Sequence, residues 1–269
     1  MKNIFIACLF LLPICLNAQQ KQVSERQQKK ADRRAQIDKL IKQEEEGALI
    51  FNKQSIFGIK LNTDGYGIFY EKGKYKTINK TNLWWIELNE HKHVKEEKFA
   101  KGDPNFGFLI GNPYVYGKIN NFYNFKIGIG QQKLIGGKGN KNGVATTLNY
   151  GGGFALAMMK PYHLDVNDPL SGATKTIRYV QDSALFLDQT RIIGATGFTK
   201  GLGRMDYIPG FHARASLRFD YGRYNETASG IEVGINAEYY TKEIVQMAQN
   251  ANKKFFFNAF VAITFGRRK

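Results

Sequence analysis

Cysteine and long apolar runs are both scarce in this sequence. Its two cysteines, Cys8 and Cys15, lie within the first 18 residues. The remainder of the chain therefore excludes a disulfide framework and a cysteine-ligated metal site. No later stretch reaches the roughly 20 apolar residues that a membrane-spanning helix needs, so the sequence predicts no transmembrane helix.

The first 18 residues have the pattern of a secretory signal peptide. Lys2 precedes an apolar run over residues 4–16, and a small-residue cleavage site ends at Ala18. We expect cleavage there, which would leave an exported chain. A lipoprotein signal with a lipid on Cys15 fits less well, because Ile14 occupies a position where such signals carry a small residue.

Basic residues far outnumber acidic ones. There are 39 lysines and arginines against 23 acidic residues, which gives a formal net charge of +16. Nucleic-acid binding is a common explanation for such a charge, but the sequence carries no nucleic-acid-binding motif and export argues against it. An anionic envelope surface is a better counterpart, since lipid phosphates attract lysine and arginine.

Residues 19–48 form a separate segment that is almost wholly polar. The part from residue 19 to residue 46 lacks glycine and proline and is rich in good helix formers. Its thin apolar stripe is too sparse to bury much surface, and Gly47 ends the segment. We predict a charged helical or flexible periplasmic lead, whose residues 20–46 could dock on a periplasmic or envelope protein.

The pattern changes in residues 49–269. Against 6 prolines the sequence holds 28 Gly, 14 Tyr and 20 Phe, which favours many strands joined by tight turns. Apolar and polar residues alternate from Phe211 to Tyr221, and similar alternation occurs at 231–239 and 255–265. Successive side chains of a strand point to opposite faces, so each segment has one apolar side. Segments of about 11 residues can cross a bilayer when tilted.

Nine such segments can be counted, including a short one near Phe57 and another at 114–118. Single-chain bacterial barrels have an even number of strands. Either the first short segment is not a full crossing, or a tenth strand is hidden in 161–209, the one long connection. This connection should face outward from the cell. The sequence therefore predicts an all-β fold, a closed antiparallel transmembrane β-barrel of eight or ten strands.

Closure determines what fills the barrel. An unpaired backbone group costs several kcal/mol in hydrocarbon, so a sheet with open edges cannot span a membrane. Eight strands leave an interior just wide enough for side chains, and charges buried there must be paired. We expect Arg218 to pair with Glu232 or Glu238. The predicted lumen polar network consists of Lys60, Glu87, Lys126, His212, Arg214, Arg218, Asp220, Glu232 and Glu238.

Other residues give little support for catalysis or metal binding. His91 and His93 lie two apart, but no further metal ligand has a helpful spacing, and a solvated loop is the better interpretation. His212, Ser216 and Asp220 share a face, yet four residues of strand span roughly 13 Å, too far for a linear triad. We predict no catalytic residue, no metal and no cofactor.

The chain resembles small Gram-negative outer-membrane β-barrel proteins, especially those of the Bacteroidota. The resemblance rests on the signal ending in Asn17-Ala18-Gln19, on the alternating strands, and on Phe257–Phe265. This last strand is similar to the aromatic-terminated strand that barrel-assembly machinery reads, but Gly266–Lys269 follow it. The resemblance implies a location in the cell outer membrane, in contact with its lipid, and no catalytic motif carries over.

Together these features predict a non-enzymatic outer-membrane barrel that is a structural or accessory component of an envelope or secretion assembly. Two alternatives stay open. The barrel could be a small pore or solute transporter, or a lipid-modifying enzyme that assembles its site across strands.

Overall fold

The chain comprises two units, Met1–Glu46 and Gly47–Lys269, each described by itself. The computed structural model describes residues 28–34, 52–77, 79–102, 109–138, 143–222 and 227–269. In the first unit, residues 28–34 are helical and exposed. The expected signal peptide, and the rest of the expected lead, lie outside the described residues. None of the described helices is long and apolar enough to cross a membrane.

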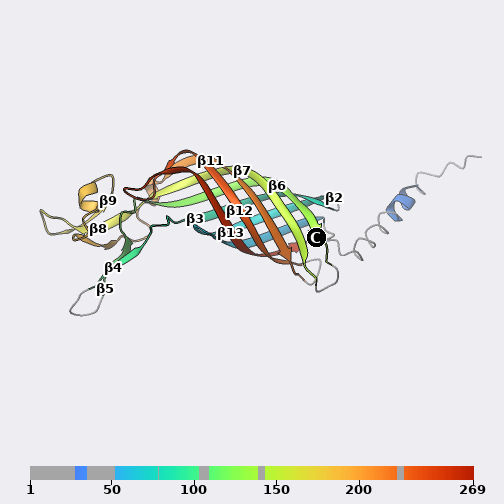
Figure 1. Cartoon of the computed structure of the whole chain (residues 1–269), viewed down its shortest axis with the longest axis horizontal. Coiled ribbons are helices and arrows are strands. Elements are labelled where there is room, and N and C mark those ends of the chain that lie inside the picture. Colours follow the sequence, from blue (N-terminus) through green and yellow to red (C-terminus); the bar gives the residue numbers. More distant parts are fainter. Residues whose placement is uncertain (1–27, 35–51, 78, 103–108, 139–142, 223–226) are drawn as a thin grey trace, which may run out of the picture. The chain divides into compact units, whose positions relative to one another are not determined.

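Eight long strands of the second unit form one antiparallel sheet. They are β1 (Lys53–Asn62), β2 (Gly65–Thr77), β3 (Lys80–His91), β6 (Asn120–Gly136), β7 (Ala145–Pro161), β11 (Asp206–Asp220), β12 (Thr227–Ile244) and β13 (Lys253–Arg268). Their hydrogen-bonded order is β1-β13-β12-β11-β7-β6-β3-β2, and β2 pairs again with β1, so the sheet forms a closed barrel (Figure 1). Eight is the lower of the two expected strand counts.

Side-chain direction follows the alternation of the sequence. In β11 the residues from Phe211 to Phe219 alternate between exposed on the outside and buried in the lumen. Strand pairing keeps this order around the barrel, since outward Leu217 lies beside outward Val233, which lies beside outward Val261. Because a one-residue slip would reverse both faces, the alternation fixes the register.

Glycines make room for one large lumen side chain. The indole of Trp85 lies so close to β6 that a Cβ atom on Gly128 would come within 2.4 Å of it. Trp85 is 1% exposed and lies across β6 where Gly128 and Gly130 point inward. Any larger residue at Gly128 would displace this ring.

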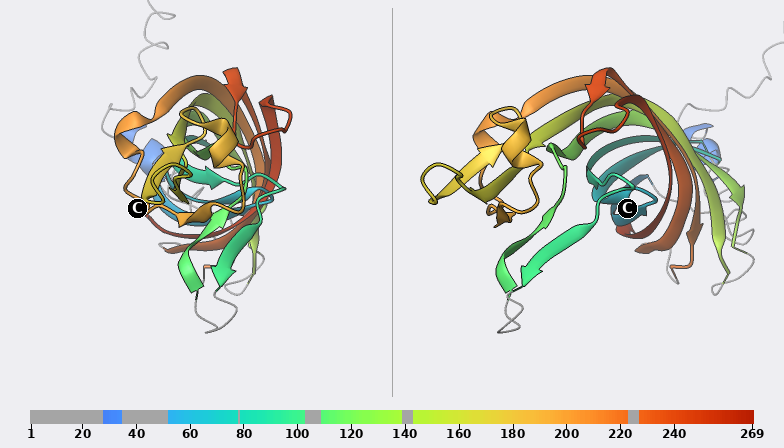
Figure 2. Two further views of the ribbon diagram at one scale, coloured as in Figure 1. Left: turned by 90° about the vertical axis from the view of Figure 1, so that its left-hand side faces the viewer. Right: turned by 60° about the vertical axis from the view of Figure 1, so that its left-hand side comes forward.

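The two rims of the barrel differ. At one rim, here called the terminal rim, β1 begins and β13 ends, and the connections 78–79, 137–144 and 221–226 are short. The opposite rim carries the connections 92–119 and 162–205 and is called the cap rim. Figure 2 shows the additional strands and the short helix gathered at the cap rim.

The connection 92–119 corrects one sequence-based prediction. The segment 114–118 was expected to be one of the barrel strands, but β5 (Leu109–Val115) pairs with β4 (Lys98–Gly102) in a separate two-stranded sheet. Tyr114 and Val115 are both buried, but outside the barrel. The surplus ninth segment is therefore this one rather than the first, and 161–209 is not the one long connection.

The second long connection contains strands but no tenth crossing. It holds β8 (His163–Asn167), β9 (Thr174–Arg178) and β10 (Ile192–Ala195), which form a three-stranded sheet of their own. A short helix, α3 (Ser183–Phe186), and a 3-10 turn, η2 (Leu202–Arg204), complete it. Strand β11 begins at Asp206, earlier than expected.

Candidate functional site

All nine side chains predicted for the lumen point inward and are buried. Their exposed fractions are at most 5%. They come from five of the eight barrel strands, β1, β3, β6, β11 and β12. They are Lys60, Glu87, Lys126, His212, Arg214, Arg218, Asp220, Glu232 and Glu238.

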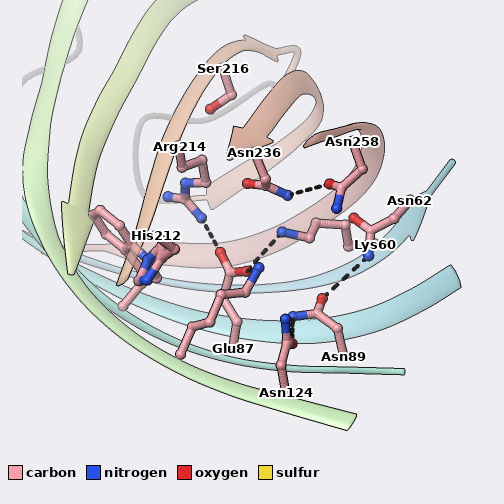
Figure 3. Close-up of polar contacts among 12 residues, drawn as sticks. Lys60, Asn62, Glu87, Asn89, Asn124, His212, Arg214, Ser216, Asn236 and Asn258 are labelled. Atoms are coloured by element: carbon pink, nitrogen blue, oxygen red, sulfur yellow. Dashed lines mark hydrogen bonds and ion pairs between the residues drawn. The ribbon is translucent and has the colours of Figure 1, made fainter. Parts of the chain in front are cut away.

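Eight of the buried charges form one continuous set of contacts, here called the lumen ion network. Glu87 lies at its centre, 2.8 Å from Lys60, 2.9 Å from Arg214 and 3.3 Å from Lys126 (Figure 3). Lys126 also contacts Glu238 at 2.8 Å. These contacts join side chains of β1, β3, β6, β11 and β12, so the network cross-links the barrel from inside.

Glu71 extends the network toward the terminal rim. Its carboxylate accepts hydrogen bonds from both Arg214 and Arg218 at 2.8 Å. Arg218 also reaches Glu232 at 2.7 Å, and Ser216 donates to the same carboxylate at 2.6 Å. The network thus holds four basic and four acidic side chains and carries no net charge. Balanced pairing of this kind is what burial of charge requires.

The last two predicted lumen residues lie outside the ion network. Asp220 pairs with Arg268 at the terminal rim, with Lys138 3.6 Å away. His212 contacts no carboxylate; it accepts a hydrogen bond from the indole nitrogen of Trp85 at 3.3 Å.

A layer of amides continues the polar lumen toward the cap rim. Asn124 donates hydrogen bonds to Glu238 at 2.7 Å and receives one from Asn89 at 2.9 Å. Asn236 donates to Asn258 at 3.1 Å (Figure 3). Amides can both donate and accept, so they satisfy the lone pairs that the ion pairs leave open.

His91 closes this layer, and the expectation that it lies in a solvated loop is wrong. It is the last residue of β3 and is 2% exposed. Its Nδ1 atom lies 2.7 Å from a carboxylate oxygen of Asp64, and its Nε2 atom 2.8 Å from the amide of Asn124. Stacking on Phe122 fixes the ring further. The reason for the difference is that β3 is longer than its alternation indicated.

The lumen chemistry is that of a filled interior. Every carboxylate of the ion network is bound to a cation, and both nitrogens of His91 contact other side chains. Over the ranges given above, no group of three or more metal-ligating side chains occurs. A filled, neutral lumen can stiffen a barrel.

Several lumen residues were missed at the level of sequence. Residues 69 and 71 point to the same face of β2, so the inward direction of Phe69 also places Glu71 inside. The asparagines lie on faces that the alternation also identifies as inward. Because they carry no charge, the expectation that buried charges must be paired does not single them out. The missed residues are Glu71, Asn89, His91, Asn124, Asn236, Tyr240 and Asn258.

Above the cap rim, the two long connections pack into one body, here called the cap (β4, β5, β8, β9, β10 and α3). A cluster of buried side chains from both connections forms its core. The cluster comprises Tyr114, Leu164, Val166, Ile177, Phe186 and Ile192. Hydrogen bonds join the connections as well, from Asn112 to the carbonyl of Ala195 at 3.2 Å and from the Tyr116 hydroxyl to that of Leu187 at 3.0 Å.

The cap presents isolated apolar side chains to its surroundings. Leu170 and Val180 are 95% and 81% exposed, and Phe198 is 67% exposed. None of the three belongs to the buried cluster that forms the core of the cap. Single exposed apolar side chains of this kind are common on protein surfaces.

No protein-family model matches the sequence, and no curated protein sequence matches it. Among solved structures the chain is similar to Neisserial surface protein A, with 8% identity, 81% of this chain and 96% of that chain covered, and a TM-score of 0.38. It is also similar to Ail, the attachment invasion locus protein of Yersinia pestis (8% identity, 82% and 100% covered, TM-score 0.34). A third is the outer membrane enzyme PagL (11% identity, 80% and 99% covered, TM-score 0.32). At these values the similarity carries no inference about function.

Proposed function

We propose that this chain is an integral outer-membrane β-barrel without enzymatic activity, and that it is a structural or accessory component of an envelope or secretion assembly. The observation that carries the proposal is the combination of a filled, neutral lumen with an ordered cap. The barrel is then a rigid membrane anchor, and the cap is the part that meets a partner.

The outer face of the barrel supports a membrane location. Large apolar side chains on it are roughly half exposed, and they follow one another around the ring. They include Phe57, Ile59, Ile68, Leu88, Ile127, Phe154, Leu217, Val233, Ile235 and Val261. A contiguous apolar belt around a closed sheet is costly in water and favourable in hydrocarbon, where closure also satisfies the backbone.

The unequal rims support an orientation. Barrels of this kind place their chain ends and short turns in the periplasm and their longer loops outside the cell. By this rule the terminal rim is periplasmic and the cap is extracellular. The charged lead would then lie in the periplasm, where residues 20–46 could dock on a second envelope protein.

The filled lumen argues against the pore alternative. In an eight-stranded barrel there is room for side chains but not for a water column as well. Here Lys60, Lys126, Arg214 and Arg218 occupy that room and are held by carboxylates on several strands. An ion would have to break these pairs to pass.

Site-specific photo-cross-linking in native membranes tests the proposal. The photoreactive residue replaces Val180 on the cap, Ala31 in the lead, or Ile235 on the apolar belt as the matched control. We expect protein adducts from Val180 or Ala31 and lipid adducts from Ile235. Absence of protein adducts at both contact positions would overturn the accessory role. Current steps in a planar bilayer would favour a pore instead.

A further inference from the structure

A basic groove runs across the outside of the barrel at the terminal rim. It has a volume of about 1100 Å³ and crosses β1, β2, β3, β6 and the end of β13. Five basic residues line it: Lys53, Lys72, Lys74, Arg267 and Lys269. Trp84 and Ile129 form its apolar side, toward the middle of the barrel.

The strand register arranges the outer face here in ordered rows. From the rim inward, paired residues read Lys53–Lys74–Asn82–Gln131, then Arg267–Ser55–Lys72–Trp84–Ile129, then Phe265–Phe57–Tyr70–Ile86–Ile127, then Ile59–Ile68–Leu88–Phe125. The first row is basic and polar, the second is basic and aromatic, and the last two are apolar. Along β2 the outward side chains change from Lys74 and Lys72 through Tyr70 to Ile68, so the surface passes from cationic to aliphatic.

No acidic side chain in the described part of the chain neutralises the positive charge of the groove. None of its five basic side chains forms an ion pair with any part of the chain that the structure describes. The nearby acids Glu71 and Asp220 point into the lumen, where arginines bind them. Lys72 instead lies over the rings of Trp84 and Tyr70, 5.7 and 5.8 Å from their centroids.

An apolar groove lies on the same strands, next to the basic one. Its volume is about 110 Å³, and Tyr70 separates it from the row of Lys72. Its outward lining comes from four strands: Phe57, Ile68, Tyr70, Ile86, Leu88 and Phe125. A narrow apolar furrow of this kind accommodates a hydrocarbon chain.

We propose that these two grooves form one binding site for an anionic glycerophospholipid of the periplasmic leaflet. The phosphodiester would lie among Lys53, Lys72, Lys74 and Arg267, and an acyl chain would follow the apolar groove. A free phosphate would not use the apolar groove, and a neutral lipid would not use the cations. The inference rests on the proposed membrane location, because only there does the head group meet the rim.

Tryptophan fluorescence offers a direct test, since Trp84 lines the groove and is 41% exposed, whereas Trp85 is 1% exposed in the lumen. The full chain is reconstituted in phosphatidylcholine vesicles that contain a minor fraction of dibrominated phosphatidylglycerol or dibrominated phosphatidylcholine. Bromine quenches the indole on contact. We expect stronger quenching by the anionic lipid. The preference should weaken at high salt, where the Debye length falls to about 3 Å at 1 M.

The groove variant combines Lys72→Gln with Lys74→Gln. The matched control, called the cap-rim variant, combines Lys175→Gln in β9 with Lys242→Gln in β12. A basic residue near a lipid surface contributes about a factor of five in association, so the groove variant should lose most of the lipid preference. The cap-rim variant removes the same charge and should keep it.

The outcomes separate this inference from the proposed function. Equal quenching by both lipids would overturn the binding site while leaving the membrane location intact. Quenching by neither lipid would overturn the membrane location, and the site with it. A preference removed by excess inorganic phosphate would show a phosphate site rather than a lipid site, and would also overturn the inference.

Discussion

Glu71 holds two arginines of the lumen ion network. It binds Arg214 and Arg218 together and is fully buried. Removal of one partner from a buried ion pair leaves an uncompensated charge, which typically costs 3–5 kcal/mol. We expect Glu71→Gln to lower the free energy of unfolding by about 3 kcal/mol or more, measured by denaturant titration of the refolded barrel.

Glu90→Gln is the matched control for this change. Glu90 lies on the outward face of β3, where it accepts a hydrogen bond from the hydroxyl of Tyr66. A pair exposed in this way contributes about 0–1 kcal/mol, so the control should remain close to the wild type. If both variants lost the same stability, the network would not be what holds the strands together.

At the residue scale, the sequence predicts which side chains face inward but not what they touch. Alternation alone places Arg218 and Glu232 in the lumen, and they do pair. The same alternation places Glu71 there, although its contacts with β11 depend on barrel closure and on strands 143 residues or more apart. Partners across a barrel are set by the register of all intervening strands, which no local pattern contains.

At the scale of the elements, β5 and β10 lie close together because residue 111 is a glycine. Gly111 has φ of +78°, and a Cβ atom there would lie 2.6 Å from the carbonyl oxygen of Ile193. We expect Gly111→Ala to loosen the cap and to make it sensitive to limited proteolysis, while the barrel stays resistant. Gly203→Ala is the control, because no atom lies within 4 Å of its added methyl group. Equal resistance of both variants would contradict a cap packed through β5 and β10.

The cap should also respond to pH through His163 in β8. Burial lowers the pKa of His163 below its ordinary value of 6.5, with Arg178, Arg204 and Lys200 acting in the same direction and the carbonyl of Pro161 against it. The folded cap therefore favours the neutral ring, so its stability is present above pH 6.5 and decreases as the pH falls below that value.

Hydrogen exchange of the amides in β8 and β9, corrected for intrinsic rates, measures this effect. Exchange should become faster on acidification in the wild type, and His163→Gln should remove most of the change. Burial also lowers the pKa of His93 in the other connection. His93→Gln is therefore the control, and a pH response that followed His93 rather than His163 would refute the assignment.

At this scale the sequence predicts long strands better than short ones. The alternation of β11, β12 and β13 extends over enough residues to define both faces. The five residues 114–118 are too few to define two faces. Tyr114 and Val115 are both buried, and Tyr114 belongs to the core of the cap rather than to the barrel. A short apolar segment indicates burial without showing which part of the molecule covers it.

For the whole molecule, the proposed membrane location requires that the outer belt meets hydrocarbon. Val233 lies in the middle of β12 with its side chain 45% exposed on the outside. An arginine at the bilayer midplane costs about 2–4 kcal/mol, and near the interfaces about 0–1 kcal/mol. Val233→Arg should therefore destabilise the barrel in lipid vesicles far more than Thr241→Arg, which lies at the cap rim beside Lys242 and Glu243. In water both positions would accept arginine equally well, so equal costs would place the belt outside the membrane and leave its apolar surface to be covered by protein.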